Sequence, residues 1–166
     1  YDSVAELESA SDITALDVQE ENGGNGSYSF TVTENGTYYI YAVDNADHFS
    51  CSEPVNVTHI DKTNPTVDSI AKDPDVEWHN GSVTISGTVS DAQTTGDMNG
   101  SGVVTVVYST SENGYAEEDY LSANYENGSY AFTVSAEEFN GTYYIWAIDA
   151  VGHVSETPAS ITVKID

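Results

Sequence analysis

The stretch GTYYIYAVDNADHFSCSEPVNVTHID at residues 36–61 returns later in the chain as GTYYIWAIDAVGHVSETPASITVKID at residues 141–166. The two stretches align without a gap at a constant offset of 105 residues, and eleven of the 26 positions are identical. A period near one hundred residues is too long for a solenoid unit and matches one whole small domain. The repeat therefore predicts a tandem array of small domains.

Apolar and polar residues alternate with a period of two, which is the pattern of β-strands that bury one face. In the second copy, for example, Val83, Ile85 and Val89 alternate with Ser and Thr. The pattern predicts an all-β chain. The strands expected in the second copy are residues 65–71, 82–90, 103–110, 117–124, 129–135, 141–149 and 158–165. Seven strands in about a hundred residues is the count of an immunoglobulin-like antiparallel β-sandwich.

Asn-Gly pairs separate the predicted strands, because tight turns need residues that accept a positive φ. They begin at residues 22, 25, 35, 80, 99, 113, 127 and 140. Six of them, together with Asn56, also match the acceptor pattern for N-glycosylation. Asn-Gly is the strongest short hairpin signal, so the pattern favours turns, and glycosylation is the alternative.

The second copy resembles the bacterial immunoglobulin-like (Big-type) tandem repeats of secreted and cell-surface proteins. The matching pieces, in the order of that family, are DKTNPTVDSI at 61–70, Trp78 with NGSVTISGTVSD at 80–91, SGVVTVVYS at 101–109, NGSY at 127–130, and NGTYYIWAID with its VGH loop at 140–153. The resemblance implies an extracellular, cell-surface location and a non-catalytic structural or adhesive spacer role. The implied partners are neighbouring repeats and a glycan or host surface.

In that family DKTNP resembles the linker between repeats, and its proline stiffens the joint. The implied domains are therefore a partial repeat at 1–61 and a complete repeat at 62–166. Tyr1 aligns near Tyr108, so the first copy has no counterpart of residues 66–107. A sandwich without those strands leaves a sheet face and an edge open. Two hypotheses account for this, with truncation of a longer array as the background to both: residues 3–19 form a substitute, or another chain donates strands by β-addition.

Composition excludes several kinds of partner. The chain carries 28 Asp and Glu against three Lys or Arg, a net charge of −25. A field of that sign repels nucleic acid and anionic membranes, so neither is expected as a partner. No apolar run approaches the length of a membrane span, so membrane insertion is not expected. The single Cys51 cannot form a disulfide within the chain.

Aromatic residues are the first candidate site. Tyr38 and Tyr143 are the expected core tyrosines, because Gly-x-Tyr resembles the tyrosine corner of immunoglobulin-like sandwiches. The pleat then places two aromatic pairs on the opposite face: Tyr39 with Tyr41, and Tyr144 with Trp146. The pattern favours cross-strand packing. The alternative is an exposed platform that stacks on carbohydrate, which suits a binding or accessory module of a secreted glycan-acting protein.

Acidic side chains in the predicted loops are the second candidate site: Asp44, Asp47, Asp61, Asp91, Asp97 and Asp149. Calcium takes six to eight oxygen ligands, which carboxylates and loop carbonyls supply. Ca²⁺ is therefore the candidate cofactor, and a solvated acidic surface is the alternative. The sequence contains no HExxH, zinc-type Cys/His spacing or GxSxG motif, so no catalytic residue and no enzyme activity is predicted.

Overall fold

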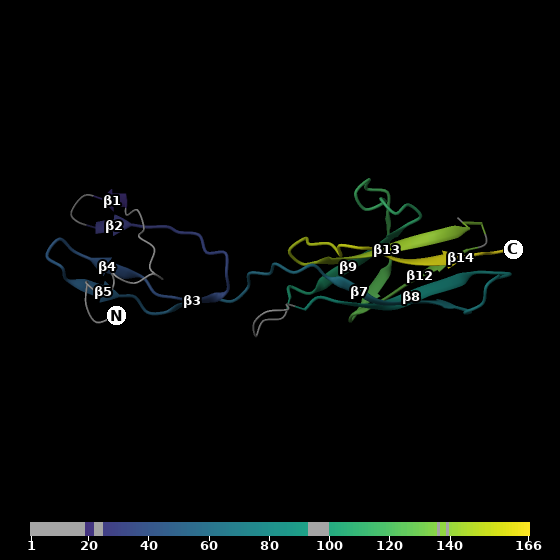
Figure 1. The fold of residues 1–166 in the computed structure, drawn as a ribbon, viewed down its shortest axis with the longest axis horizontal. Helices are drawn as coiled ribbons and strands as arrows, with labels where there is room; N and C mark the ends of the chain where they lie inside the picture. Colours follow the sequence, from purple (N-terminus) through teal and green to yellow (C-terminus); the bar gives the residue numbers. More distant parts are fainter. Residues whose placement is uncertain (1–18, 22–24, 93–99, 136, 139) are drawn as a thin grey trace. The chain divides into compact units, whose positions relative to one another are not determined.

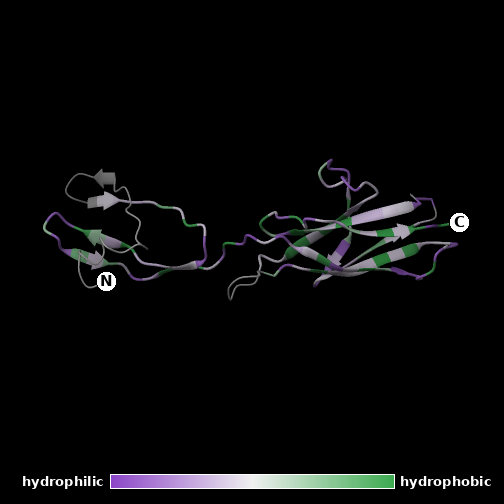
Figure 2. Ribbon diagram, viewed as in Figure 1, coloured by the Kyte–Doolittle hydropathy of each residue, from purple (hydrophilic) through white to green (hydrophobic). Residues whose placement is uncertain are grey.

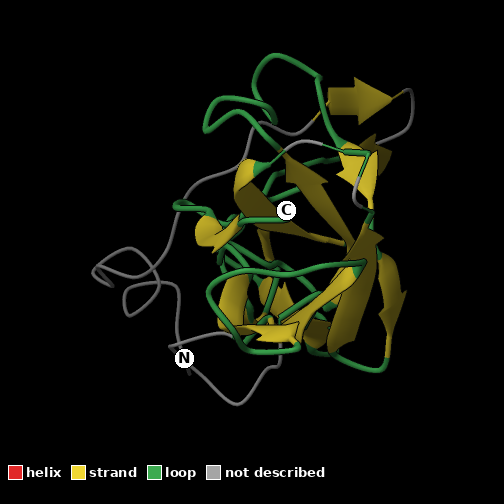
Figure 3. Ribbon diagram, turned by 90° about the vertical axis from the view of Figure 1, so that its right-hand side faces the viewer, coloured by secondary structure: helices red, strands yellow, loops and turns green. Residues whose placement is uncertain are grey.

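The computed structural model describes residues 19–21, 25–92, 100–135, 137–138 and 140–166. The chain forms two compact units, Tyr1–Ile60 and Asp61–Asp166. All regular structure in the described residues is β-strand, and every pairing between named strands is antiparallel (Figures 1 and 3). The predicted all-β, antiparallel sandwich class is confirmed. The described residues form no helix long and apolar enough to span a bilayer.

The second unit contains two four-stranded sheets, which form two layers (Figure 1). One sheet holds, in spatial order, β11 (Asn124–Glu126), β12 (Ser129–Val134), β8 (Val83–Ser90) and β7 (Thr66–Asp73). The other holds β10 (Leu121–Ser122), β9 (Val103–Ser109), β13 (Gly141–Asp149) and β14 (Ala159–Val163). Because their inward faces are apolar, the two layers bury a common core.

The core consists of side chains at alternate positions on both sheets, as Figure 2 shows by bands of hydrophobic residues. Its aromatic centre is Phe132 of β12, whose ring stacks on Tyr108 of β9 at 3.8 Å between centroids. Tyr143 of β13 packs against both rings and is buried, as predicted. The long-range contact between β9 and β12 therefore joins the two layers.

The side chain of Tyr130 on β12 crosses β8 and reaches the backbone of β7. Its hydroxyl donates a hydrogen bond to the Ser69 carbonyl of β7 at 3.0 Å, and burial raises its pKa to about 12. The phenol reaches β7 by passing Gly87 of β8. A Cβ at Gly87 would lie 2.0 Å from the Ser69 oxygen and 2.7 Å from the tyrosine hydroxyl. Only glycine fits at this position.

Six of the seven predicted strands are present with small changes at their ends, but the strand expected at 117–124 is wrong. Residues 112–118 form turns, and Glu118 has a positive φ of 56°. The following chain splits into β10, which pairs with β9, and β11, which pairs with β12 in the other sheet. Between them Ala123 donates its N–H to Val106 at 2.9 Å. The chain crosses between the layers here, which an alternation pattern does not reveal.

The Asn-Gly pairs have two different roles. Asn127 and Gly128 have φ values of 50° and 79° and form the two-residue turn between β11 and β12, as predicted. Asn140 instead binds the backbone of the segment that follows β14, through its side-chain amide. Its Nδ2 donates to the Ile165 carbonyl at 2.7 Å, and its Oδ1 accepts from the Ile165 N–H at 3.0 Å. Asn35 makes the same pair of bonds, both at 2.8 Å, with Ile60.

The first unit contains three short strand pairs in its described part. They are β1 (Gln19–Glu21) with β2 (Asn25–Ser27), β3 (Gly36–Tyr38) with β6 (Val55–Val57), and β4 (Tyr41–Val43) with β5 (Phe49–Cys51). None of the residues 26–60 is fully buried. Tyr38 is half-buried, and its hydroxyl donates to the Glu34 carbonyl at 2.7 Å. Residues 3–18, most of the segment expected to complete this unit, lie outside the described residues.

Candidate functional site

Three aspartates and one histidine lie at one end of the second unit. We call this set the acidic end: Asp61, Asp91, Asp149 and His153. Asp149 ends β13, Asp91 follows β8, and Asp61 precedes β7. Asp61, Asp149 and His153 each place one potential ligand atom within 4.8 Å of the others. The strand ends therefore bring two of the six predicted calcium ligands, Asp61 and Asp149, together with His153.

Asp149 holds the loop that follows β13. Its side chain is fully shielded from solvent. Its Oδ1 accepts hydrogen bonds from the N–H groups of Val151 at 2.9 Å and His153 at 2.8 Å. Its Oδ2 lies 2.9 Å from Nδ1 of His153. Because an ionised carboxylate only accepts, Nδ1 carries the hydrogen of this bond.

The first unit has the same loop at the offset of 105. Asp44 Oδ1 accepts from the N–H groups of Ala46 at 2.8 Å and His48 at 3.0 Å, and its Oδ2 lies 2.9 Å from Nδ1 of His48. The bond from the His48 N–H, followed by the other two, lowers the pKa of Asp44 below its usual value. The Asp-x-x-x-His spacing therefore sets the shape of this loop in both units.

Two further carboxylates complete the acidic end. Asp61 Oδ1 accepts from the Thr63 N–H and hydroxyl at 3.0 and 2.7 Å, and Oδ2 accepts from the Ser101 N–H at 2.6 Å. Burial opposes ionisation of Asp61, but these hydrogen bonds together outweigh it and hold its pKa well below the usual range. Asp61 thus ties the first residues of the second unit to the loop before β9.

The pKa of Asp91 is shifted in the opposite direction from that of Asp61. Its Oδ2 accepts from the Gly102 N–H at 2.6 Å, and its buried Oδ1 has no hydrogen-bond partner among the described residues. Burial, together with the negative charges of Asp61 and Asp149, raises the pKa of Asp91. An oxygen-seeking cation at this end would relieve the repulsion and supply the missing partner.

The other predicted calcium ligands lie elsewhere. Asp44 and Asp47 belong to the first unit, and they join no group of three metal-ligating side chains among the described residues. Asp47 has a positive φ of 62° in the turn of the loop. Asp97 lies outside the described residues. His153 was not predicted as a ligand, although its recurrence four residues after an Asp in both copies is visible in the sequence.

The predicted aromatic surface is only partly present. At Trp146 the alternative of an exposed platform is wrong, because its side chain is 5% exposed, and the favoured interpretation of a packed aromatic residue holds. The segment between β9 and β10 covers it: Tyr115 lies 6.4 Å from the Trp146 ring and stacks on Tyr120 at 5.4 Å. Tyr144 lies 6.5 Å from Trp146 on the same side and stays half-buried. We call Tyr115, Tyr120, Tyr144 and Trp146 the aromatic patch.

The sequence did not identify Tyr115 and Tyr120 as members of this patch, because the segment that carries them was predicted to be partly strand. In the first unit Tyr39 is 54% exposed and Tyr41 is half-buried on β4. Both therefore keep accessible ring surface, as the carbohydrate hypothesis requires.

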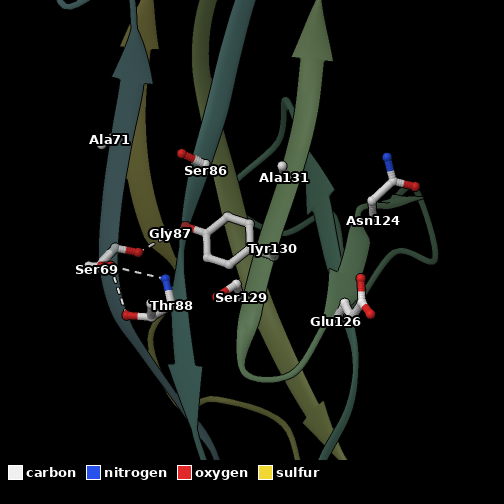
Figure 4. A pocket seen from close by; sticks show the side chains of 10 residues that line it. All are labelled: Ser69, Ala71, Ser86, Gly87, Thr88, Asn124, Glu126, Ser129, Tyr130 and Ala131. Atoms are coloured by element: carbon white, nitrogen blue, oxygen red, sulfur yellow. Dashed lines mark hydrogen bonds between the residues drawn. The ribbon is translucent and has the colours of Figure 1, made fainter.

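A shallow hollow lies on the sheet formed by β11, β12, β8 and β7 (Figure 4). Its lining consists mainly of small side chains, including Ser69, Ser86, Thr88 and Ala131. Neither histidine nor cysteine is among the residues that line it. The hollow presents hydroxyl groups together with the side chains of Asn124 and Glu126.

Comparison of the chain with protein-family models gives no match, and comparison with curated proteins gives none either.

Proposed function

We propose that this chain is a non-catalytic spacer from an extracellular bacterial surface protein, built from tandem immunoglobulin-like repeats of the Big type. The observation that carries the proposal is that the repeated Asp and His residues make the same hydrogen bonds in both units. Asp44 and His48 form the same loop bonds as Asp149 and His153. The repeated residues are thus engaged in holding the fold, as expected of a structural module.

The beginning of the second unit supports the spacer role. Asp61 binds both Thr63 and Ser101, and Pro65 is buried. A linker residue that is fixed in this way gives the unit a defined point of entry, which a semi-rigid array needs. The partners implied are neighbouring repeats and a glycan or host surface at the far end of the protein.

Small-angle X-ray scattering on concatenated copies of residues 61–166 tests the spacer role. A stiff array lengthens by at least about 30 Å per added unit, because the nine residues of β13 alone span that distance at ~3.3 Å per residue. A maximum dimension that grows much more slowly than the number of units would refute a spacer. A matched array with Pro65→Gly shows how far the proline contributes to stiffness.

Carbohydrate binding is the second candidate function, and the stacked pair Tyr115 and Tyr120 favours it. Tyr120 is exposed, and aromatic side chains that reach solvent can stack on sugar rings. Glycan-array binding that is lost in Tyr120→Ala and retained in Tyr120→Phe would support this function. Trp146→Ala is a poorer test, because removing a buried ring also disturbs packing. Absence of binding by the parent chain would leave only the spacer role.

Calcium is the cofactor that we propose for the acidic end. The support is the buried Oδ1 of Asp91, which lacks a hydrogen-bond partner among the described residues, beside the carboxylates of Asp61 and Asp149. A hard divalent cation fits this oxygen-rich set, and binding here would fix Asp61 more firmly to the unit. The test is the calcium dependence of the melting temperature, compared between the parent chain and Asp91→Asn.

A further inference from the structure

The loop between β9 and β10, residues 110–120, carries two of the four rings of the aromatic patch and is held in a compact arrangement. The Gly114 N–H donates to the Ser111 carbonyl at 3.0 Å, and the Gly114 carbonyl accepts from the Asp119 N–H at 2.8 Å. Gly114 is buried, and a Cβ there would clash with the side chain of Ser109 on β9. Because an ordered loop loses little conformational entropy when a ligand binds, these contacts favour recognition by the rings that the loop carries.

The rings of the aromatic patch form a continuous row that reaches solvent at Tyr120. Tyr120 stacks on Tyr115 at 5.4 Å between centroids, and Tyr115 lies 6.4 Å from the ring of Trp146. Trp146 is 5% exposed, whereas Tyr120 is 39% exposed. The buried end of the row therefore fixes the position of the exposed end, which is the part that a ligand can reach.

The residues next to the exposed ring are acidic. Between Tyr115 and Tyr120 the sequence is AEED, and its three acids, Glu117, Glu118 and Asp119, are all exposed. None of the three has an ion-pair partner in the described part of the chain. The three lysines of the chain, at positions 62, 72 and 164, lie outside this loop, and the chain has no arginine. A cationic group bound beside Tyr120 would thus meet carboxylates without competition from a neighbouring basic residue of the loop.

We infer that the aromatic patch selects glycans that carry free, positively charged amino groups. This inference rests on the carbohydrate-binding function proposed above and names its ligand class. A sugar ring stacks on Tyr120, and an ammonium group on that sugar is attracted both by the electron-rich ring and by the carboxylates of the loop. A glycan with carboxylate or sulfate groups is repelled by the same carboxylates. The charge of the loop therefore decides which class of glycan the rings accept.

The test compares two oligosaccharides with the same backbone. Tetramers of β-1,4-linked glucosamine and of N-acetylglucosamine differ by acetylation, which removes the positive charge of each amine. Their affinities for the full chain are measured by isothermal titration calorimetry at pH 6 and low salt. The parent chain should bind the charged tetramer about 10-fold more tightly. That ratio corresponds to ~1.4 kcal/mol, which one exposed cation–π contact and one or two surface ion pairs supply together. Added salt should reduce the ratio.

Two triple variants separate the effect of the loop from the net charge of the chain. The loop variant, Glu117→Gln with Glu118→Gln and Asp119→Asn, should bind the two tetramers with equal affinity. The control variant makes the same change in net charge at exposed acids in and just after β7, on the other sheet: Asp68→Asn, Asp73→Asn and Asp75→Asn. It should keep the 10-fold preference. Tyr120→Ala should lose binding of both tetramers, and Tyr120→Phe should retain it.

Each contrary result has a distinct meaning. Equal affinity of the parent chain for the two tetramers would overturn this inference and leave carbohydrate binding in place. Absence of binding to both would refute the carbohydrate-binding function, and the inference with it. Loss of the preference in the control variant would show that the net charge of the whole chain attracts the amines, which also overturns the inference. Tetralysine supplies positive charge without sugar rings, so binding as tight as that of the glucosamine tetramer would overturn the glycan assignment in favour of a basic peptide.

Discussion

Replacing Asp149 by Ala should strongly destabilise the second unit. The side chain is fully shielded from solvent and accepts bonds from two backbone N–H groups and from Nδ1 of His153. A hydrogen bond to a charged group contributes about 1.5–3 kcal/mol, and Ala leaves all three donors without their acceptor. Some of these donors regain water in the opened loop, so we expect a loss of roughly 3 kcal/mol in the free energy of unfolding. For a domain of this size that corresponds to a fall of roughly 15 °C in melting temperature.

The chain offers an internal control for this prediction. Asp44 accepts the same three bonds in the first unit, but it is exposed. Urea unfolding followed by tryptophan fluorescence reports on the second unit alone, because both tryptophans lie there. Asp149→Ala should lower the urea midpoint, Asp149→Asn should lower it less, and Asp44→Ala should leave it unchanged. Equal midpoints for Asp149→Ala and the parent chain would refute the role given to this carboxylate.

The same assay tests three further predictions, and thermal unfolding tests a fourth. Asn140→Ala should lower the free energy of unfolding by about 2 kcal/mol, because it removes two neutral hydrogen bonds to the Ile165 backbone. Asn35→Ala should leave the tryptophan signal unchanged. His79→Phe should raise stability by about 1 kcal/mol, because both ring nitrogens of this buried histidine lack hydrogen-bond partners in the described structure; a lower midpoint would contradict this. The pKa of Asp91 is raised above its usual value of 3.8, so the folded state loses stability as pH rises from 3.8 through the raised pKa. At pH 7 without calcium, Asp91→Asn should therefore be more stable than the parent chain. Millimolar calcium should raise the melting temperature of the parent and not that of Asp91→Asn, and an equal response of the two chains would remove Asp91 from the proposed site.

The sequence predicted those parts of the fold that depend on local patterns. Alternation of Val83, Ile85 and Val89 with polar residues placed β8 to within one residue, because a half-buried strand must alternate. Asn127 and Gly128 predicted their turn for an equally local reason. The hydrogen bonds of the Asn140 side chain were not predicted, because their partner Ile165 lies 25 residues away.

The candidate sites depended more on contacts between distant segments. Trp146 occupies the outer face of β13, as the pleat predicts, but the turn that carries Tyr115 covers it. Nothing in the local pattern shows that this turn folds back over the sheet. Asp61 and Asp149 were candidates because the sequence pattern placed them at predicted loops, and the strand order then brought them together. Composition alone could not separate these two from the other acids of a chain with a net charge of −25.

Single-molecule extension of the chain tests most directly the central claim that the second unit is an independently folded, load-resisting module. The unit has 106 residues, from Asp61 to Asp166, and a fully extended chain spans at most ~3.3–3.6 Å per residue. After subtraction of its folded length, unfolding should appear as one abrupt step of roughly 300 Å. A gradual extension without a force peak, or several small steps in place of one, would contradict the account.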